Sequence, residues 1–164
     1  MPHTSKNSAS PPVKSAVPLV ELRGDDQEDT KLLQEMAAQA HRYVTSLPWC
    51  IEVHERYFGA GVGGIVALFL FRVTIRKVTR PEWIWVFVGD TPSAYLEVDS
   101  FLSPYAALLC YIEGVEEWLG APGEERESGN LIPIEVPAGP EYVEMLRVRI
   151  ETLRSLVLPY LSKD

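Results

Sequence analysis

The strongest pattern in the chain is the largely apolar run of residues 63–96. In its first part both sets of alternate positions are apolar, and further along only one set is. One set of alternate positions is apolar throughout: Ile65, Ala67, Phe69, Phe71, Val73 and Ile75. The positions between them are apolar as far as Leu70 and then become Arg72, Thr74 and Arg76. Because side chains of a strand alternate between two faces, the pattern predicts a central strand covered on both faces at one end only.

The next break in the pattern predicts a hairpin. Residues 78–81 (VTRP) suit a four-residue loop, since Pro81 has no amide hydrogen for a strand ladder, and residues 82–88 form the return strand. On one face this register pairs Ile75 with Ile84, Val73 with Val86 and Phe71 with Val88. On the other face it pairs Arg76 with Trp83, Thr74 with Trp85 and Arg72 with Phe87.

This arginine and aromatic face has three interpretations. The plainest is that a helix covers it, with the arginines extending to the rim, because monomers rarely leave a large apolar patch open. A second is that Arg72, Arg76, Trp83 and Trp85 bind a partner or ligand, since Trp and Arg are enriched at binding hot spots. The third is a homodimer, in which the face pairs across a two-fold axis.

The remaining segments supply cover for these strands. Residues 1–26 are polar and proline-rich and predict a disordered head, in which residues 17–22 are the part suited to an edge strand. Residues 27–164 then form a single domain. Helices are expected at 28–46, from Ser103 to 119 and at 141–158, and an extended piece at 131–136. Together with strands at 49–58 and 95–98, this is an α+β fold: an antiparallel meander sheet of three to four strands packed with about three helices.

Residues 49–58 alternate, which predicts a strand buried on one side. Trp49, Ile51, Val53 and Tyr57 are expected to point inward. Cys50, Glu52, His54 and Arg56 are expected to point outward. No further ligand nearby completes a metal site with Cys50, Glu52 and His54, so no metal is predicted.

Two other motifs also have plain explanations. Residues 59–64 match G-x-G-x-x-G, but the strand before them is charged, so we interpret them as a glycine-rich hairpin connection or bulge. Asp90 lies in a Gly-Asp-Thr-Pro turn, and with Glu97 and Asp99 it is the best carboxylate group of the chain. A simple turn accounts for Asp90, and the alternative is a pocket beside that turn with Asp90 and Tyr95 in its wall. No catalytic residue or cofactor is predicted.

Composition excludes some classes of function. The chain has 164 residues, 46% of them hydrophobic, and a net charge of −8, which argues against binding nucleic acid through phosphates. The uncharged run from Phe58 to Phe71 is shorter than the roughly 20 residues that a membrane-spanning helix needs. The N-terminal residues lack the apolar stretch of a secretory signal, so a cytoplasmic location is expected.

Two stretches of the chain carry a family resemblance: WIWVFVGDTPSAYL and, downstream, LIPIEVPAGPEYVEMLRVRIETL. They resemble an uncharacterised family of bacterial conserved-hypothetical proteins that carry a similar W-x-V-x-V-G-D-x-P-x-x-Y stretch and a similar proline-bounded last helix. The resemblance covers most of residues 28–160 and implies no activity, cofactor or catalytic residue.

The pattern as a whole favours a non-enzymatic cytosolic protein-interaction domain, immunity- or adaptor-like. This hypothesis rests on the lack of a catalytic set, on the aromatic and arginine face, and on an acidic helix face with Glu113, Glu116 and Glu117. The alternative is a small-molecule-binding protein or enzyme with a pocket near the Asp90 turn. A concave site lined by Asp90, Tyr95 and the tryptophans would favour the alternative.

Overall fold

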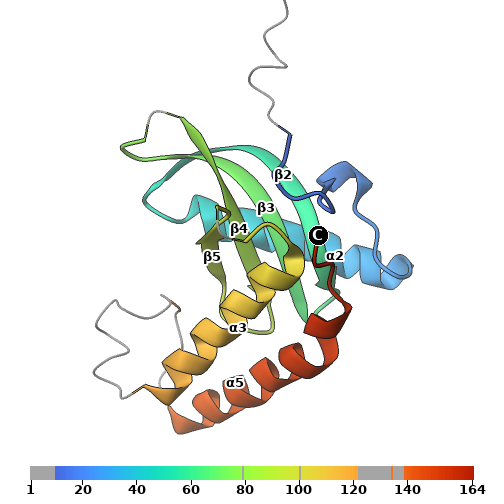
Figure 1. Ribbon diagram of the computed structural model, residues 1–164, viewed down its shortest axis with the longest axis vertical. Helices are drawn as coiled ribbons and strands as arrows, with labels where there is room; N and C mark the ends of the chain where they lie inside the picture. The colour runs from blue at the N-terminus through green and yellow to red at the C-terminus, as the bar shows by residue number, and fades with distance from the viewer. Residues whose placement is uncertain (1–9, 79, 100, 122–133, 135–138) are drawn as a thin grey trace, which may run out of the picture.

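The computed structural model describes residues 10–78, 80–99, 101–121, 134 and 139–164 (Figure 1). Its sheet contains five antiparallel strands in chain order: β1 (Val17–Pro18), β2 (Cys50–Val62), β3 (Val66–Ile75), β4 (Pro81–Gly89) and β5 (Ala94–Glu97). Its main helices are α2 (Gln27–Thr45), α3 (Pro104–Gly120) and α5 (Pro140–Thr152). The predicted α+β class and meander sheet are confirmed, with one strand more than expected.

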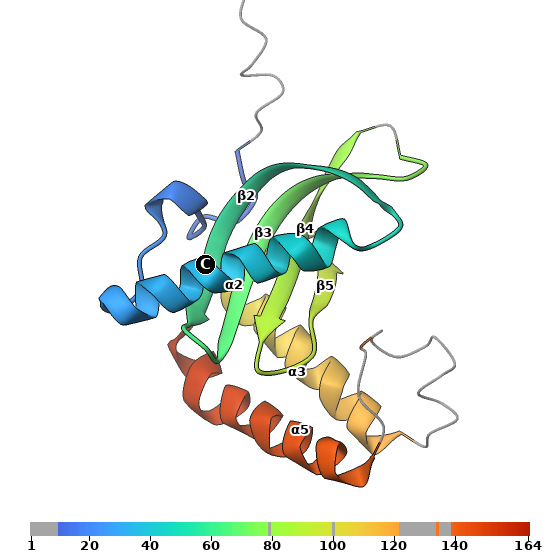
Figure 2. The same cartoon turned by 180° about the vertical axis from the view of Figure 1, so that it is seen from behind.

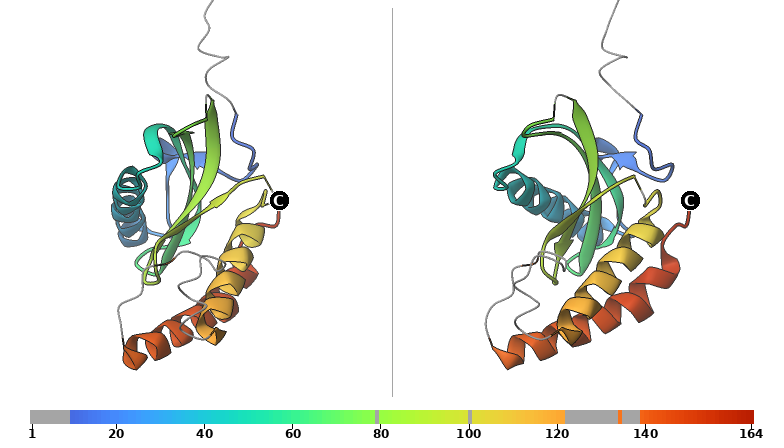
Figure 3. Two further views of the ribbon diagram at one scale, coloured as in Figure 1. Left: turned by 90° about the vertical axis from the view of Figure 1, so that its left-hand side faces the viewer. Right: turned by 60° about the vertical axis from the view of Figure 1, so that its left-hand side comes forward.

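The molecule has three layers, because helices cover both faces of the sheet (Figures 2 and 3). On one face, α2 buries Leu33, Ala40 and Val44 against Phe69, Phe71 and Val86 of the sheet. On the other face, α3 and α5 share a core with the remaining inward residues of β3 and β4, among them Leu68, Leu70, Trp85 and Phe87. The central strand is therefore covered on both faces, as its first half predicts.

The β3–β4 hairpin differs from the prediction by four residues in register. Phe71 lies opposite Ile84 and Arg72 opposite Trp83, whereas the sequence predicted Val88 and Phe87 as their partners. The predicted loop was too short: β3 ends at Ile75, and Lys77 takes a left-handed backbone conformation (φ 74°) in the longer connection. Since four is an even number, every side chain still points to its predicted face.

Strand β2 is longer and more irregular than predicted. Its register with β3 shifts at three places: between Cys50 and Glu52, between Val53 and Glu55, and between Phe58 and Ala60. Each shift is a bulge or irregularity that interrupts the alternation of sides, so the predicted inward position of Ile51 is wrong and its side chain is 55% exposed. The glycine-rich segment forms the last bulge and the turn into β3, which agrees with the interpretation of its motif.

Asp29 connects the start of α2 to the sheet. The helix is capped by Asp26, whose carboxylate accepts a hydrogen bond from the amide of Asp29 at 2.8 Å. The Asp29 carboxylate accepts the amide of Asp25 at 2.8 Å with one oxygen and that of Gly63 at 2.6 Å with the other. The Asp29 side chain thus joins the segment before α2 to the β2–β3 turn.

The described part of the expected disordered head, residues 10–26, packs on the domain. Val13 and Leu22 are buried, and Val17 and Pro18 pair with Tyr57 and Phe58 of β2. Within the segment 17–22, Val17–Pro18 therefore supply an edge strand, and Leu19–Glu21 form a 3-10 turn instead.

The C-terminal half ends in a helix that changes its winding. After α5 the chain continues as a π-helical turn (Leu153–Val157) and a short 3-10 turn (Leu158–Tyr160). The predicted extended piece at 131–136 lies outside the described residues, apart from Ile134. In the part of the chain that the structure describes, no helix is long and apolar enough to cross a lipid bilayer.

Candidate functional site

The predicted aromatic and arginine face is closed rather than open. Trp85 is fully buried in the core shared with α3, and its indole Nε1 donates to the carbonyl of Phe101 at 2.7 Å. Trp83 is partly buried against the same core and meets the ring of Tyr57 edge-on, with the centroids 5.7 Å apart. A covering helix, the plainest of the three interpretations, accounts for this face.

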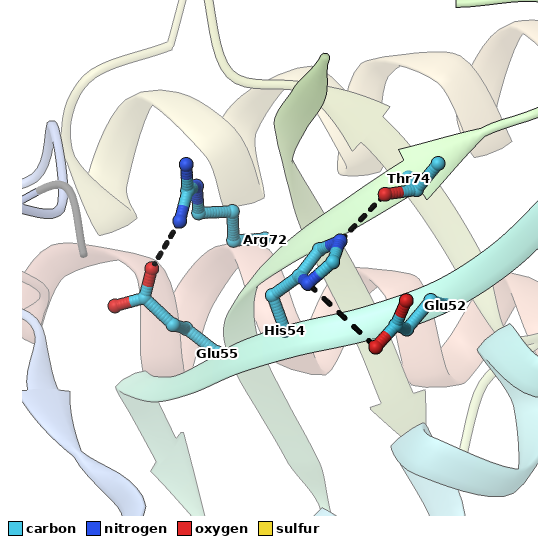
Figure 4. A network of polar contacts seen from close by, with 5 residues as sticks. All are labelled: Glu52, His54, Glu55, Arg72 and Thr74. Atoms are coloured by element: carbon cyan, nitrogen blue, oxygen red, sulfur yellow. Dashed lines mark hydrogen bonds and ion pairs between the residues drawn. The ribbon is translucent and has the colours of Figure 1, made fainter. Parts of the chain in front are cut away.

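The two predicted arginines have partners within the chain, and Figure 4 shows the contact that Arg72 makes. Arg72 Nη1 donates to Glu55 Oε2 at 2.9 Å, and both side chains are largely shielded from solvent. The Arg76 guanidinium donates to the carbonyl of Pro48 at 3.0 and 3.2 Å. Arg72 and Arg76 thus tie strand β3 to β2 and to the segment before it.

A second contact in Figure 4 has the composition of a catalytic triad without its geometry. His54 Nε2 lies 2.5 Å from Thr74 Oγ1, but His54 Nδ1 is 3.9 Å from Glu52 Oε2, beyond hydrogen-bond distance. Glu52 is also mostly exposed. The group is a cross-strand polar contact, because the carboxylate does not orient the imidazole.

The carboxylates near the β4–β5 turn do not form a metal site. Among the described residues, no group of three His, Cys, Asp or Glu side chains is placed to hold a metal ion. Asp90 instead binds Arg149 of α5: Arg149 Nε lies 3.1 Å from Asp90 Oδ2, and its Nη1 donates to the Asp90 carbonyl at 3.0 Å. The Asp90 amide donates to the carbonyl of Ile65 at 2.9 Å. Asp90 therefore anchors the turn between neighbouring elements.

A pocket of about 660 Å³ lies beside this turn, where the α2–β2 connection meets the β4–β5 connection. Its aromatic lining is Tyr43, Trp49 and Tyr95. Its hydroxyl-bearing lining is Ser46, Thr91 and Ser93, with Leu47, Pro92 and Ile134 as the other described contributors. Figure 2 shows how this arises: the C-terminal end of α2 lies over β4 and β5.

Two aromatic rings in contact with each other form one wall of the pocket. The rings of Trp49 and Tyr95 are in contact, with their centroids 4.7 Å apart and their planes inclined by 56°. Trp49 follows the helix-ending Pro48, and Tyr95 sits on β5 opposite Val86. Tyr95 was predicted as a site residue, whereas Trp49 and Tyr43 were missed, because no local pattern indicates which distant segment they meet.

The opposite wall is held by buried polar contacts. Thr91 and Pro92 are buried, and the Tyr111 hydroxyl of α3 donates to the Pro92 carbonyl at 2.6 Å. Burial raises the pKa of Tyr111 well above its ordinary value, although a hydrogen bond with Thr91 acts in the opposite direction. Tyr111 therefore stays a neutral hydrogen-bond donor, and the turn keeps its shape.

The lining sets the chemistry that the pocket supports. None of its described residues carries a charge at neutral pH, and their ionisable groups are tyrosine hydroxyls. Aromatic side chains with a few polar groups are the usual composition of small-molecule pockets, whose volumes are roughly 300–1,000 Å³. The arrangement can stack a flat molecule and hydrogen-bond its edge, and none of the described lining residues is a carboxylate or an imidazole that could transfer a proton.

Comparison with known proteins adds no constraint. No family model, curated protein or solved structure matches the chain, so the resemblance to a bacterial family stays a prediction.

Proposed function

We propose that this protein binds a small, flat, uncharged molecule in the pocket beside the β4–β5 turn, and that it binds without catalysis. The observation that carries the proposal is the contact of Trp49 with Tyr95 in a pocket whose described lining residues carry no charge. Aromatic rings offer stacking surface to a planar ligand, and nearby hydroxyl groups select for polar atoms at its edge.

The absence of charge in the lining narrows the ligand class. A phosphate or carboxylate group would need a compensating cation, and no described lining residue supplies one. The chain's net charge of −8 further disfavours anions. A neutral heteroaromatic molecule, such as a nucleobase-type ring, satisfies both conditions.

The first experiment compares neutral flat probes with their charged counterparts by calorimetric titration. Adenosine and riboflavin are expected to bind, and AMP and FMN to bind more weakly, because only the phosphate differs within each pair. Trp49→Leu and Tyr95→Leu should each weaken binding about tenfold, since stacking of a base on an aromatic ring is worth about 1–3 kcal/mol. Tyr160→Leu, an exposed tyrosine away from the pocket, serves as the matched control.

Two outcomes would contradict the proposal. The first is equal or tighter binding of the phosphorylated probes, which would indicate an anion site elsewhere. The second is the absence of binding by any of the four probes at about millimolar concentration, where a binding free energy of only about 4 kcal/mol is detectable.

A further inference from the structure

The last helix is apolar on its outward side as well as on its inward side. Leu146, Ile150 and Leu153 are buried toward the core, as a covering helix requires. On the far side, Met145 is 42%, Val148 59% and Leu156 67% exposed. Packing against α3 accounts only for the buried residues, because α5 lies at the margin of the helical layer (Figures 1 and 3).

The exposed apolar side chains form a continuous stripe. Met145, Val148 and Thr152 lie along one side of α5, at intervals of three and four residues. Leu156, in the π-helical turn, continues this side, because it lines the same groove as Val148 and Thr152. The stripe extends over about 16 Å at the helical rise of 1.5 Å per residue. Ile65, which is 40% exposed, adjoins it across a cavity of about 160 Å³ shared with Thr152 and Arg149. We name these residues (Ile65, Met145, Val148, Thr152 and Leu156) the outer stripe.

Carboxylates border the outer stripe. The surface groove of about 690 Å³ that includes Val148 and Leu156 is also lined by Glu116, Glu144, Glu151 and Arg147. Arg147 lies 3.4 Å from Glu144, and Glu116 is held by Arg154 of the π-helical turn at 2.6 Å. Arg147 and Arg154 therefore each pair with one of the three carboxylates, which leaves an excess of one negative charge, at Glu151, in a protein that is itself acidic.

We propose that the outer stripe docks a basic amphipathic helix of a partner protein. The apolar anchors of such a helix, spaced three or four residues apart, cover Val148 and Leu156. Its lysines or arginines meet Glu151 and also Glu144, whose exposed ion pair with Arg147 is weak enough to be exchanged. Helix docking by apolar anchors needs this kind of exposed stripe, and the acidic border selects the charge of the partner.

The charges at the border disfavour two other occupants. A second copy of this chain would bring the same carboxylates to the contact, and like charges facing each other across an interface are repulsive. A membrane surface rich in anionic lipids would be repelled for the same reason. This inference is independent of the ligand proposed for the aromatic pocket, because the two sites share no lining residue.

The test uses fluorescence anisotropy with a labelled helical peptide of leucine and lysine, about 18 residues or five turns long. The full-length protein is expected to bind it saturably, and to bind neither a leucine–glutamate peptide of the same pattern nor a leucine–lysine peptide whose scrambled order leaves no apolar face. The double variant Val148→Ser/Leu156→Ser should bind at least tenfold more weakly, because it removes the two most exposed anchors. Glu144→Gln/Glu151→Gln should weaken binding and reduce its dependence on salt.

The control removes exposed apolar side chains elsewhere. Val20→Ser/Ile51→Ser changes two equally exposed residues far from α5 in the chain and should leave peptide affinity unchanged. Since all four substituted side chains are largely exposed, both double variants are expected to fold, which circular dichroism verifies.

Three results would overturn the inference. One is equal peptide affinity of the wild type and the Val148→Ser/Leu156→Ser variant. Another is a dimer in light scattering that this variant dissociates, which would make a second copy the occupant. The third is binding to vesicles with about one-third anionic lipid that the same variant abolishes, which would make the stripe a membrane contact.

Discussion

Gly59 of β2 lies so close to the side chain of Trp85 of β4 that a methyl group added at Gly59 would collide with the indole ring. A Cβ atom at Gly59 would be 2.7 Å from Cζ3 of Trp85 and 3.0 Å from the carbonyl oxygen of Leu68. Gly59→Ala should therefore lower the free energy of unfolding by about 1–3 kcal/mol, as overpacked core positions do. Urea denaturation followed by tryptophan fluorescence measures the change.

Gly120→Ala is the matched control for this prediction. Among the described residues, no atom outside the adjoining residues and the helix's own backbone lies within 4 Å of the Cβ position at the last residue of α3, so the methyl group meets no obstacle there. Alanine also favours helix by up to about 1 kcal/mol. Gly59→Ala should lower the free energy of unfolding, whereas Gly120→Ala should leave it unchanged or raise it. An equal decrease in both variants would contradict the role assigned to Trp85.

His41 should make the fold sensitive to acid. Burial, and secondarily the nearby Arg56, lowers the pKa of His41 below its ordinary value of 6.5. As the pH falls through 6.5, the unfolded chain takes up a proton before the folded protein does, so the free energy of unfolding falls. Denaturation at pH 7 and pH 5 should show a smaller loss for His41→Gln than for the wild type, and an equal loss would contradict this prediction.

At the scale of elements, the Asp29 side chain is expected to contribute more to the stability of the fold than its neighbour Glu28 on α2. Asp29→Ala removes the acceptor for the amides of Asp25 and Gly63 and should cost about 2–3 kcal/mol, because two hydrogen bonds to a charged acceptor are lost and the one from Asp25 is exposed. Glu28→Ala, one residue earlier, should cost only about 0.3–1 kcal/mol through the helix dipole. Thermal unfolding of both variants distinguishes the roles, and equal costs would rule out the link to the β2–β3 turn.

The sheet shows which features of an element a sequence can predict. Side-chain alternation in β3 and β4 correctly divided Phe71 and Ile84 from Arg72 and Trp83, because that division depends only on the period of two. The register was wrong, because Pro81 was placed in the loop and instead begins β4. In β2, bulges turned Ile51 outward, and bulges leave no mark in an alternating pattern.

The candidate site was less predictable than the fold for a related reason. Tyr95 and the turn at Asp90 were identified from local signals, but their neighbours Trp49 and Tyr43 come from a segment about 50 residues earlier in the sequence. Only the packing of α2 over β4 and β5 brings these side chains together. Local periodicity contains no information about such contacts between elements that are distant in the chain.

At the scale of the whole molecule, the N-terminal segment should contribute to stability. Leu22 is buried beneath α2, and Leu22→Ala should cost about 2–4 kcal/mol, as buried leucines do. Val20→Ala, two residues earlier but 86% exposed, should change stability by less than about 0.5 kcal/mol. Chemical denaturation of both variants is the test, and a neutral Leu22→Ala would mean that the segment detaches in solution.

The order of strands in the sheet has a consequence for the protein during its synthesis. Each strand pairs with the one made just before it, so the growing chain can extend the sheet strand by strand as it leaves the ribosome. α2 is synthesised before β2–β5 and can cover one face of the sheet as soon as that face forms. On the other face, Trp85 and Phe87 stay uncovered until α3 has been synthesised. The nascent protein therefore passes through a stage in which α2 covers one face of the sheet while the other face still exposes apolar side chains. That second face is where a chaperone would bind.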